Sequence, residues 1–169
     1  SSYIYIILIN FNKIIIFHGI NEANYKKKGN DYFEKALKII ELKYLGKVEI
    51  ITTLDLPYNS YINSYNKAHI ILDQIYAYDQ GYNALEAMAK GKVVFTGAEE
   101  EFTAHYKLLD RVCINAIPDV DYLVNELSFL IENPEEIVAI GKRARAFIEK
   151  EHDYIEIATR YLLAWNNNF

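Results

Sequence analysis

Short apolar runs of strand length alternate along the chain with segments of helical periodicity. Five runs rich in Val and Ile have the composition of strands that are buried on both faces. They are Lys13–His18, Lys47–Thr53, His69–Gln74, Lys92–Thr96 and Arg111–Asn115. Glycines and polar loops separate these runs from the segments between them, so the pattern predicts strands joined by helices.

The intervening segments repeat apolar residues every three or four positions, which is typical of amphipathic helices. One stripe consists of Phe33, Leu37, Ile40 and Tyr44, with Gly46 as a stop signal. Further helices are expected over Pro57–Lys67, over Asn83–Lys90, and at about 119–132, 134–150 and 153–166. This order of elements predicts the α/β class, as a Rossmann-like, doubly wound parallel sheet in a single domain.

Residues 1–12 are assigned to a linker or an extra edge strand, and residues 13–169 to the domain. The apolar run Tyr3–Ile9 is only seven residues long before Asn10 interrupts it, whereas a membrane-spanning helix needs about 20. We therefore expect no transmembrane segment.

The formal net charge of -5 disfavours a nucleic-acid partner, because phosphate contacts need a basic surface. The single cysteine, Cys113, excludes an intramolecular disulfide and a cysteine metal cluster, and it fits a reducing cytoplasm. The four histidines are scattered without the spacing of metal ligands, so no metal site is expected.

In parallel sheets, ligands bind beyond the carboxyl ends of the strands. The loop Gly19–Asn30 lies there and contains the run Lys26-Lys27-Lys28. Glycine lets the backbone approach a ligand, lysine supplies a charge for a phosphate oxygen, and the next helix points its positive end at the same space. The same residues also fit a solvated basic loop, so both interpretations stay open at this point.

Glu86 also has two interpretations. Asn83 and Glu86 have the spacing of a capping box, with Asn83 as the N-cap of the helix that follows Gly81. Alternatively, Glu86 accepts hydrogen bonds from two adjacent hydroxyl groups, as an acidic residue does for a ribose.

Three segments resemble group 1 retaining glycosyltransferases with the GT-B fold. Ala84–Val94 (ALEAMAKGKVV) is similar to their Glu-Ala-Met-Ala-x-Gly-x-Pro-Val-Val signature. The loop FHG…KKKGNDYF resembles their first-strand loop with its Lys-Gly, and LIENPEEIVAIGKRARAFIEKEH resembles their final helices. The resemblance runs from about Lys13 to Trp165 and implies the C-terminal, donor-binding domain.

The resemblance implies a role for each matching position. Lys28 would neutralise the donor diphosphate, as the catalytic group, and Gly19 would let the first loop pass under the phosphates. Glu86 would bind the ribose hydroxyls. The phosphates would also be held by the backbone amides near Gly81, Tyr82 and Asn83.

The chain departs from the family pattern at two positions. Ile20 stands where an arginine commonly follows the loop glycine, and Tyr78 stands where the family has an acidic residue eight positions before Glu86. Either Asp79 substitutes for that acidic residue, or the Asp73-Gln74 pair meets the sugar instead.

The implied function is to bind a UDP-sugar or GDP-sugar, without a further cofactor, for hexose transfer to a glycan or lipid-linked acceptor in polysaccharide biosynthesis. The acceptor site would lie in a missing N-terminal domain or partner subunit, so the chain alone is expected to be inactive. It is expected in the cytoplasm, with the missing half allowing contact with the inner face of the membrane. The alternatives are a sugar-nucleotide epimerase domain and a non-catalytic GT-B-like subunit that docks on an acceptor-domain partner.

Overall fold

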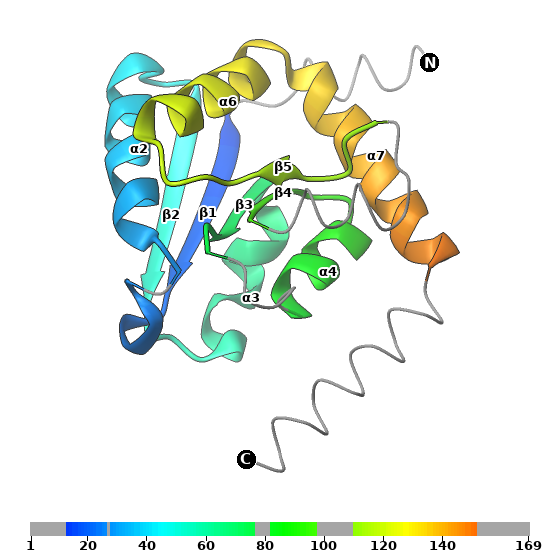
Figure 1. Ribbon diagram of the computed structural model, residues 1–169, viewed down its shortest axis with the longest axis horizontal. Helices are drawn as coiled ribbons and strands as arrows, with labels where there is room; N and C mark the ends of the chain where they lie inside the picture. The colour runs from blue at the N-terminus through cyan, green and yellow to red at the C-terminus, as the bar shows by residue number, and fades with distance from the viewer. Residues whose placement is uncertain (1–12, 27, 77–81, 98–109, 152–169) are drawn as a thin grey trace.

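The computed structural model describes residues 13–26, 28–76, 82–97 and 110–151 (Figure 1). Five parallel strands form one sheet in the order β2-β1-β3-β4-β5. They are β1 (Ile14–Ile20), β2 (Val48–Leu54), β3 (Ile70–Gln74), β4 (Val93–Thr96) and β5 (Ile114–Asn115). All five predicted strands and their parallel arrangement are therefore confirmed, although β1 extends two residues further and β5 is shorter than expected.

The helices also follow the sequence pattern. They are the 3-10 helix η1 (Glu22–Asn24) and the α-helices α2 (Asn30–Lys43), α3 (Tyr58–Lys67), α4 (Tyr82–Ala89), α6 (Val120–Glu132) and α7 (Pro134–Lys150). Five of the six predicted α-helices are thus confirmed, and the sixth, at about 153–166, lies outside the described residues. None of the helices within the described ranges is long and apolar enough to cross a membrane.

Helices cover both faces of the sheet, as Figure 1 shows. On one face, Phe33 and Ile40 of α2 and Leu127 of α6 pack with Ile16 of β1. The core of the other face comes from α3, α4 and α7, with the side chains of Phe17, Tyr65, Met88 and Phe147. Strands β3 and β4 are buried along their whole length, whereas the edge strand β2 is half exposed. Burial on both faces explains why the central strands are continuous apolar runs.

Two glycines bring α7 against the turn that joins α4 to β4. A Cβ atom at Gly141 would lie 2.2 Å from the carbonyl oxygen of Gly91. Gly91 itself has a φ of +73°, a conformation in which side chains other than glycine's are strained. The α4–β4 turn can therefore lie this close to α7 only because residue 141 of α7 is a glycine.

Lys92 joins α3 to the start of β4. Its Nζ atom donates to the carbonyl oxygens of Asn66, at 2.9 Å, and Ala68, at 2.6 Å, at the carboxyl end of α3. A cation is favourable there because it faces the negative end of the helix dipole. Burial, with a smaller effect from Lys90, lowers the pKa of Lys92 to about 8.

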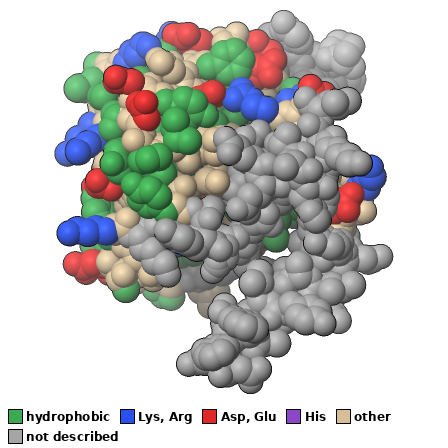
Figure 2. All heavy atoms as spheres, viewed as in Figure 1, with side chains coloured by type: hydrophobic (Ala, Val, Ile, Leu, Met, Phe, Trp, Pro, Cys, Tyr) green, Lys and Arg blue, Asp and Glu red, His purple; other side chains and the backbone are tan. Residues whose placement is uncertain are grey.

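Charged side chains of both signs are mixed on the face that α2 and α6 form. Figure 2 shows Lys and Arg side chains dispersed among Asp and Glu side chains, without one continuous basic patch. The described residues of this face therefore show no concentration of positive charge of the kind that binds a nucleic-acid backbone.

Candidate functional site

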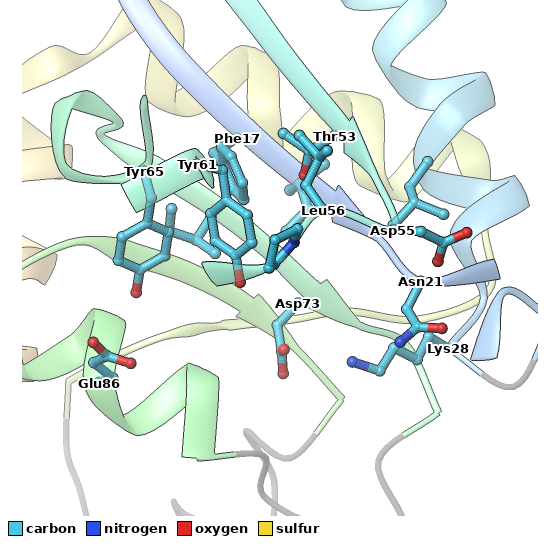
Figure 3. A pocket seen from close by; sticks show the side chains of 15 residues that line it. Phe17, Asn21, Lys28, Thr53, Asp55, Leu56, Tyr61, Tyr65, Asp73 and Glu86 are labelled. Carbon is cyan, nitrogen blue, oxygen red and sulfur yellow. The ribbon is translucent and has the colours of Figure 1, made fainter. Parts of the chain in front are cut away.

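The strand order reverses between β1 and β3, because β2 lies on one side of β1 and β3 on the other. In open α/β sheets, ligands bind at such a switch point, beyond the carboxyl ends of the strands. A cleft with a volume of about 410 Å³ lies at this position (Figure 3). Its lining consists of Phe17, Gly19, Ile20, Asn21, Lys28, Thr53, Asp55, Leu56, Pro57, Tyr61, Tyr65, Ile71, Leu72, Asp73 and Glu86.

Gly19 forms part of the cleft wall near the end of β1. A Cβ atom added to it would lie 3.1 Å from the ring of Phe17 and 3.6 Å from the Thr53 hydroxyl oxygen. Any larger side chain would therefore crowd the cleft. The structure brings Gly19 to the location that the sequence predicted for it.

Lys28 is held against the end of β3 by its backbone. Its amide donates to the carbonyl oxygen of Asn24, and its own carbonyl oxygen accepts from the amide of Ile75, both at 2.9 Å. The next residue, Gly29, has a φ of +71°, and a Cβ atom there would lie 2.9 Å from the Cβ atom of Ile75. This tight junction carries the Lys28 ammonium to the cleft.

The fold places the described lysines of the first loop in different surroundings. Lys28 lines the cleft. Lys26 is exposed and lines a different hollow, together with Tyr25 and Glu34. Lys27 lies outside the described residues. Of the two described lysines, only Lys28 is therefore in a position to neutralise an anion bound in the cleft.

Glu86 reaches the cleft from α4. Its carboxylate forms an ion pair with Lys90 across 3.3 Å, one helical turn further on, and its side chain is 25% exposed. Lys90 in turn donates to the Asn66 side chain at 3.2 Å. These contacts hold Glu86 at the rim of the cleft, where its side chain is partly exposed.

The capping-box interpretation of Glu86 is wrong. It requires Asn83 to be the N-cap, but α4 begins at Tyr82, so Asn83 is already the second residue of the helix. The helix starts earlier than predicted because Tyr82 also takes helical backbone geometry. Tyr82 and Asn83 stand in the first turn of α4, and the structure describes their backbone only. Asp79 and Gly81 lie outside the described residues.

Asp73 is a cleft residue that the sequence offered, together with Gln74, as the alternative to Asp79 for meeting the sugar. It occupies β3 where the register with β4 shifts between Leu72 and Gln74. Such irregularities re-aim side chains and are common beside active sites. Asp73 is only 8% exposed, and burial raises the pKa of its carboxyl to about 6, while the Lys28 ammonium opposes this rise. The sequence signal was an acidic residue at the end of an apolar strand.

Aromatic side chains form the opposite wall of the cleft. The ring of Phe17 lies 5.5 Å from that of Tyr61 and 5.7 Å from that of Tyr65, between ring centres. Close by, the carboxylate of Asp55 accepts from the amide of Glu22 at 2.9 Å and so fixes the mouth of the first loop. The tyrosines come from α3, which Lys92 holds in place.

The lining has a definite distribution of charge. Among the described residues, Lys28 is its one cation, and the carboxylates of Asp55, Asp73 and Glu86 are its anions. Figure 3 shows the Lys28 and Glu86 side chains converging on the cleft from different elements, with Asp73 between them. This arrangement can bind a ligand that combines an anionic group with several hydroxyl groups.

Comparisons with known proteins agree with this fold. Residues 21–163 match the Glycosyl transferase-like family. A comparison with curated proteins gave no match. Among solved structures, the chain is similar to the C-terminal domain of the glycosyl transferase group 1 family protein LpcC from Francisella tularensis, with 17% identity and a TM-score of 0.59. That similarity covers 83% of this chain and 85% of the other.

Two further structures share the fold. The catalytic domain of cholesterol-alpha-glucosyltransferase from Helicobacter pylori is 13% identical, with a TM-score of 0.53 over 81% of this chain and 98% of that one. UDP-GlcNAc 2-epimerase from Neisseria meningitidis, solved with UDP-GlcNAc, is 15% identical, with a TM-score of 0.50 over 90% of this chain and 50% of that one. The chain therefore belongs to the Glycosyl transferase-like family and has the fold of the C-terminal domain of a group 1, GT-B glycosyltransferase, as the sequence resemblance implied.

Proposed function

We propose that the cleft binds a nucleoside diphosphate sugar, UDP- or GDP-linked, and that the domain supplies the donor site for hexose transfer to a glycan or lipid-linked acceptor. The observation that carries the proposal is the convergence of Lys28 and Glu86 on one cleft at the switch point of the sheet. Lys28 provides the positive charge for a diphosphate, and Glu86 provides the acceptor for ribose hydroxyls.

In the proposed reaction, negative charge builds up on the diphosphate as the bond to the sugar breaks. A cation held in place before the reaction stabilises that charge without reorganising. The backbone of Lys28 is fixed by two hydrogen bonds and by its junction with Ile75, so its ammonium is suited to this role. Front-side attack with retention of configuration would require no nucleophile from this domain.

The acceptor site would come from a further domain or a partner subunit, since the described cleft is formed by one sheet and its helices. We therefore expect the 169-residue chain to bind the donor but to show no measurable hexose transfer by itself. Turnover on an acceptor at the rate of a two-domain enzyme would contradict this part of the proposal.

Nucleotide binding should depend on Lys28 and not on Lys26. A hydrogen bond to a charged group contributes about 1.5–3 kcal/mol, so Lys28→Ala should weaken the best nucleotide by roughly 10- to 100-fold. Lys26→Ala removes the same charge from the same loop outside the cleft and is the matched control. Thermal shifts with UDP, GDP and their sugars would identify the ligand, because a ligand at 100 times its Kd stabilises by about 2.7 kcal/mol.

The absence of any thermal shift across this panel would remove the nucleotide proposal. Equal losses in the two lysine variants would point to a long-range effect of charge rather than to a site. Stabilisation by a UDP-sugar, followed by its conversion to another sugar nucleotide, would instead favour the epimerase alternative, which the UDP-GlcNAc 2-epimerase fold similarity motivates.

Glu86→Gln should weaken nucleotide binding by about 1–2 kcal/mol, because a neutral acceptor replaces a charged one. It should lower the free energy of unfolding by less than about 1 kcal/mol, since a partly exposed i,i+4 pair contributes about 0.3–0.5 kcal/mol. Glu149→Gln is the control, because Glu149 forms a similar exposed i,i+4 pair with Arg145 at 3.2 Å. Calorimetric titration and a urea melt measure the two effects separately, and unchanged nucleotide affinity in Glu86→Gln would leave Glu86 with a structural role only.

A further inference from the structure

Asp73 presents an unsatisfied carboxylate in the cleft. Its Oδ2 atom is fully buried, and no hydrogen-bond partner for that atom is present among the described residues. A buried polar atom without a partner costs roughly 1–3 kcal/mol, and more when the group is charged. A chain that keeps such a group at a ligand-binding position is therefore expected to satisfy it with the ligand.

The surroundings of Asp73 limit what that ligand group can be. Lys28 is the charged residue whose field acts on Asp73, and it favours the ionised form of the carboxylate. A phosphate would meet like charge on the carboxylate. Hydroxyl groups are neutral donors, and an ionised carboxylate has about four lone-pair sites to accept them.

Asp73 differs in this respect from the other carboxylates of the lining. Asp55 already accepts from the Glu22 amide, and Glu86 is paired with Lys90. Asp73 lies on the same face of β3 as Ile71, which also lines the cleft, and Figure 3 shows its carboxylate between the Lys28 and Glu86 side chains. Its position allows it to meet the part of a ligand that adjoins an anion held by Lys28.

We propose that Asp73 is a ligand-binding residue of this cleft and that its carboxylate accepts hydrogen bonds from hydroxyl groups of the bound nucleotide sugar, an inference that rests on the function proposed above. Both the ribose and the hexose of such a ligand carry suitable hydroxyls. The two sources can be separated, because a nucleoside diphosphate contains only the ribose.

The test compares Asp73→Asn with the unmodified chain in calorimetric titrations against UDP, GDP and the matching nucleotide sugars. Asn keeps the shape of Asp73 but loses the charge and half of the acceptor capacity. We expect the variant to bind the nucleotide sugar roughly 5- to 30-fold more weakly. Asp121→Asn, an exposed change of the same charge in α6, should leave all affinities unaltered.

Each result bears on the inference. A loss confined to the nucleotide sugar assigns the contact to the hexose, and an equal loss with the nucleoside diphosphate assigns it to the ribose. Unchanged or tighter binding of both ligands by Asp73→Asn would overturn the role of Asp73 while leaving the proposed function intact. If the unmodified chain bound neither ligand, both the proposed function and this inference would fall.

Discussion

Gly141→Ala is expected to lower the free energy of unfolding by about 1–3 kcal/mol, which is the usual cost of forcing an extra methyl group into a packed site. The new Cβ atom would lie 2.2 Å from the Gly91 carbonyl oxygen, which is backbone and cannot move aside as a side chain can. Helix propensity alone gives the opposite sign, because alanine stabilises a helix interior by about 1 kcal/mol relative to glycine. The direction of the change therefore decides between packing and propensity.

Urea denaturation of Gly141→Ala measures this effect. Lys142→Ala is a suitable control, because it alters the neighbouring exposed position of the same helix and should change stability by no more than about 0.5 kcal/mol. A Gly141→Ala protein as stable as the unmodified chain would mean that the packing cost is no larger than the gain of about 1 kcal/mol from helix propensity.

Asp73→Asn is expected to stabilise the ligand-free protein above about pH 7 by about 1–3 kcal/mol, and to lose this advantage below about pH 4. Burial raises the pKa of Asp73 from 3.8 to about 6 in the folded state. Between these two values the folded chain binds more protons than the unfolded chain, so the contribution of Asp73 to stability falls as the pH rises. Above the folded pKa the full cost of the buried charge is present, and asparagine removes it.

The free energy of unfolding of Asp73→Asn and of the unmodified chain should be measured from pH 3.5 to 8. The difference between the two curves reports the contribution of Asp73, because the other titrating residues are the same in both proteins. Asp121→Asn, which removes an exposed carboxylate from α6, serves as the comparison for the loss of one negative charge. A variant less stable than the unmodified chain at pH 7.5 would show that the Asp73 charge is compensated in the free protein. If Asp73→Asn is more stable than the unmodified chain but binds the ligand more weakly, the Asp73 carboxylate serves binding rather than folding.

Much of the candidate site could be predicted because it depends on local chain chemistry. The end of β1 and the loop after it were expected to supply a glycine and a cation near a helix start, and Gly19 and Lys28 are both found in the cleft wall. Glu86 was predicted from its signature, and it lines the same cleft. Gly19 and Lys28 lie near the end of β1 and the start of α2, and Glu86 lies within α4, and the positions of these elements follow from periodicity.

Other parts of the site depended on contacts between distant segments. Lys26 and Lys28 are equivalent by composition, and they separate only because the Lys28 carbonyl meets the Ile75 amide at the end of β3. Asp73 could be seen as a polar strand ending, but its burial in the cleft wall is decided by the segments that pack around the end of β3. α4 begins one residue earlier than predicted, so Asn83 lies inside the helix and is not its N-cap. Sequence patterns do not locate helix ends to within one or two residues.

By itself, the sequence determined the order of strands and helices, the parallel sheet and the strand-end loops that face a ligand, because apolar periodicity and glycine positions act over a few residues. Only the tertiary structure decided that Lys28, Asp73 and Glu86 share one cleft, and that Gly141 touches Gly91. Those contacts join residues that are far apart in the chain. Their geometry and the burial that raises the pKa of Asp73 arise only when the sheet and its helices pack together.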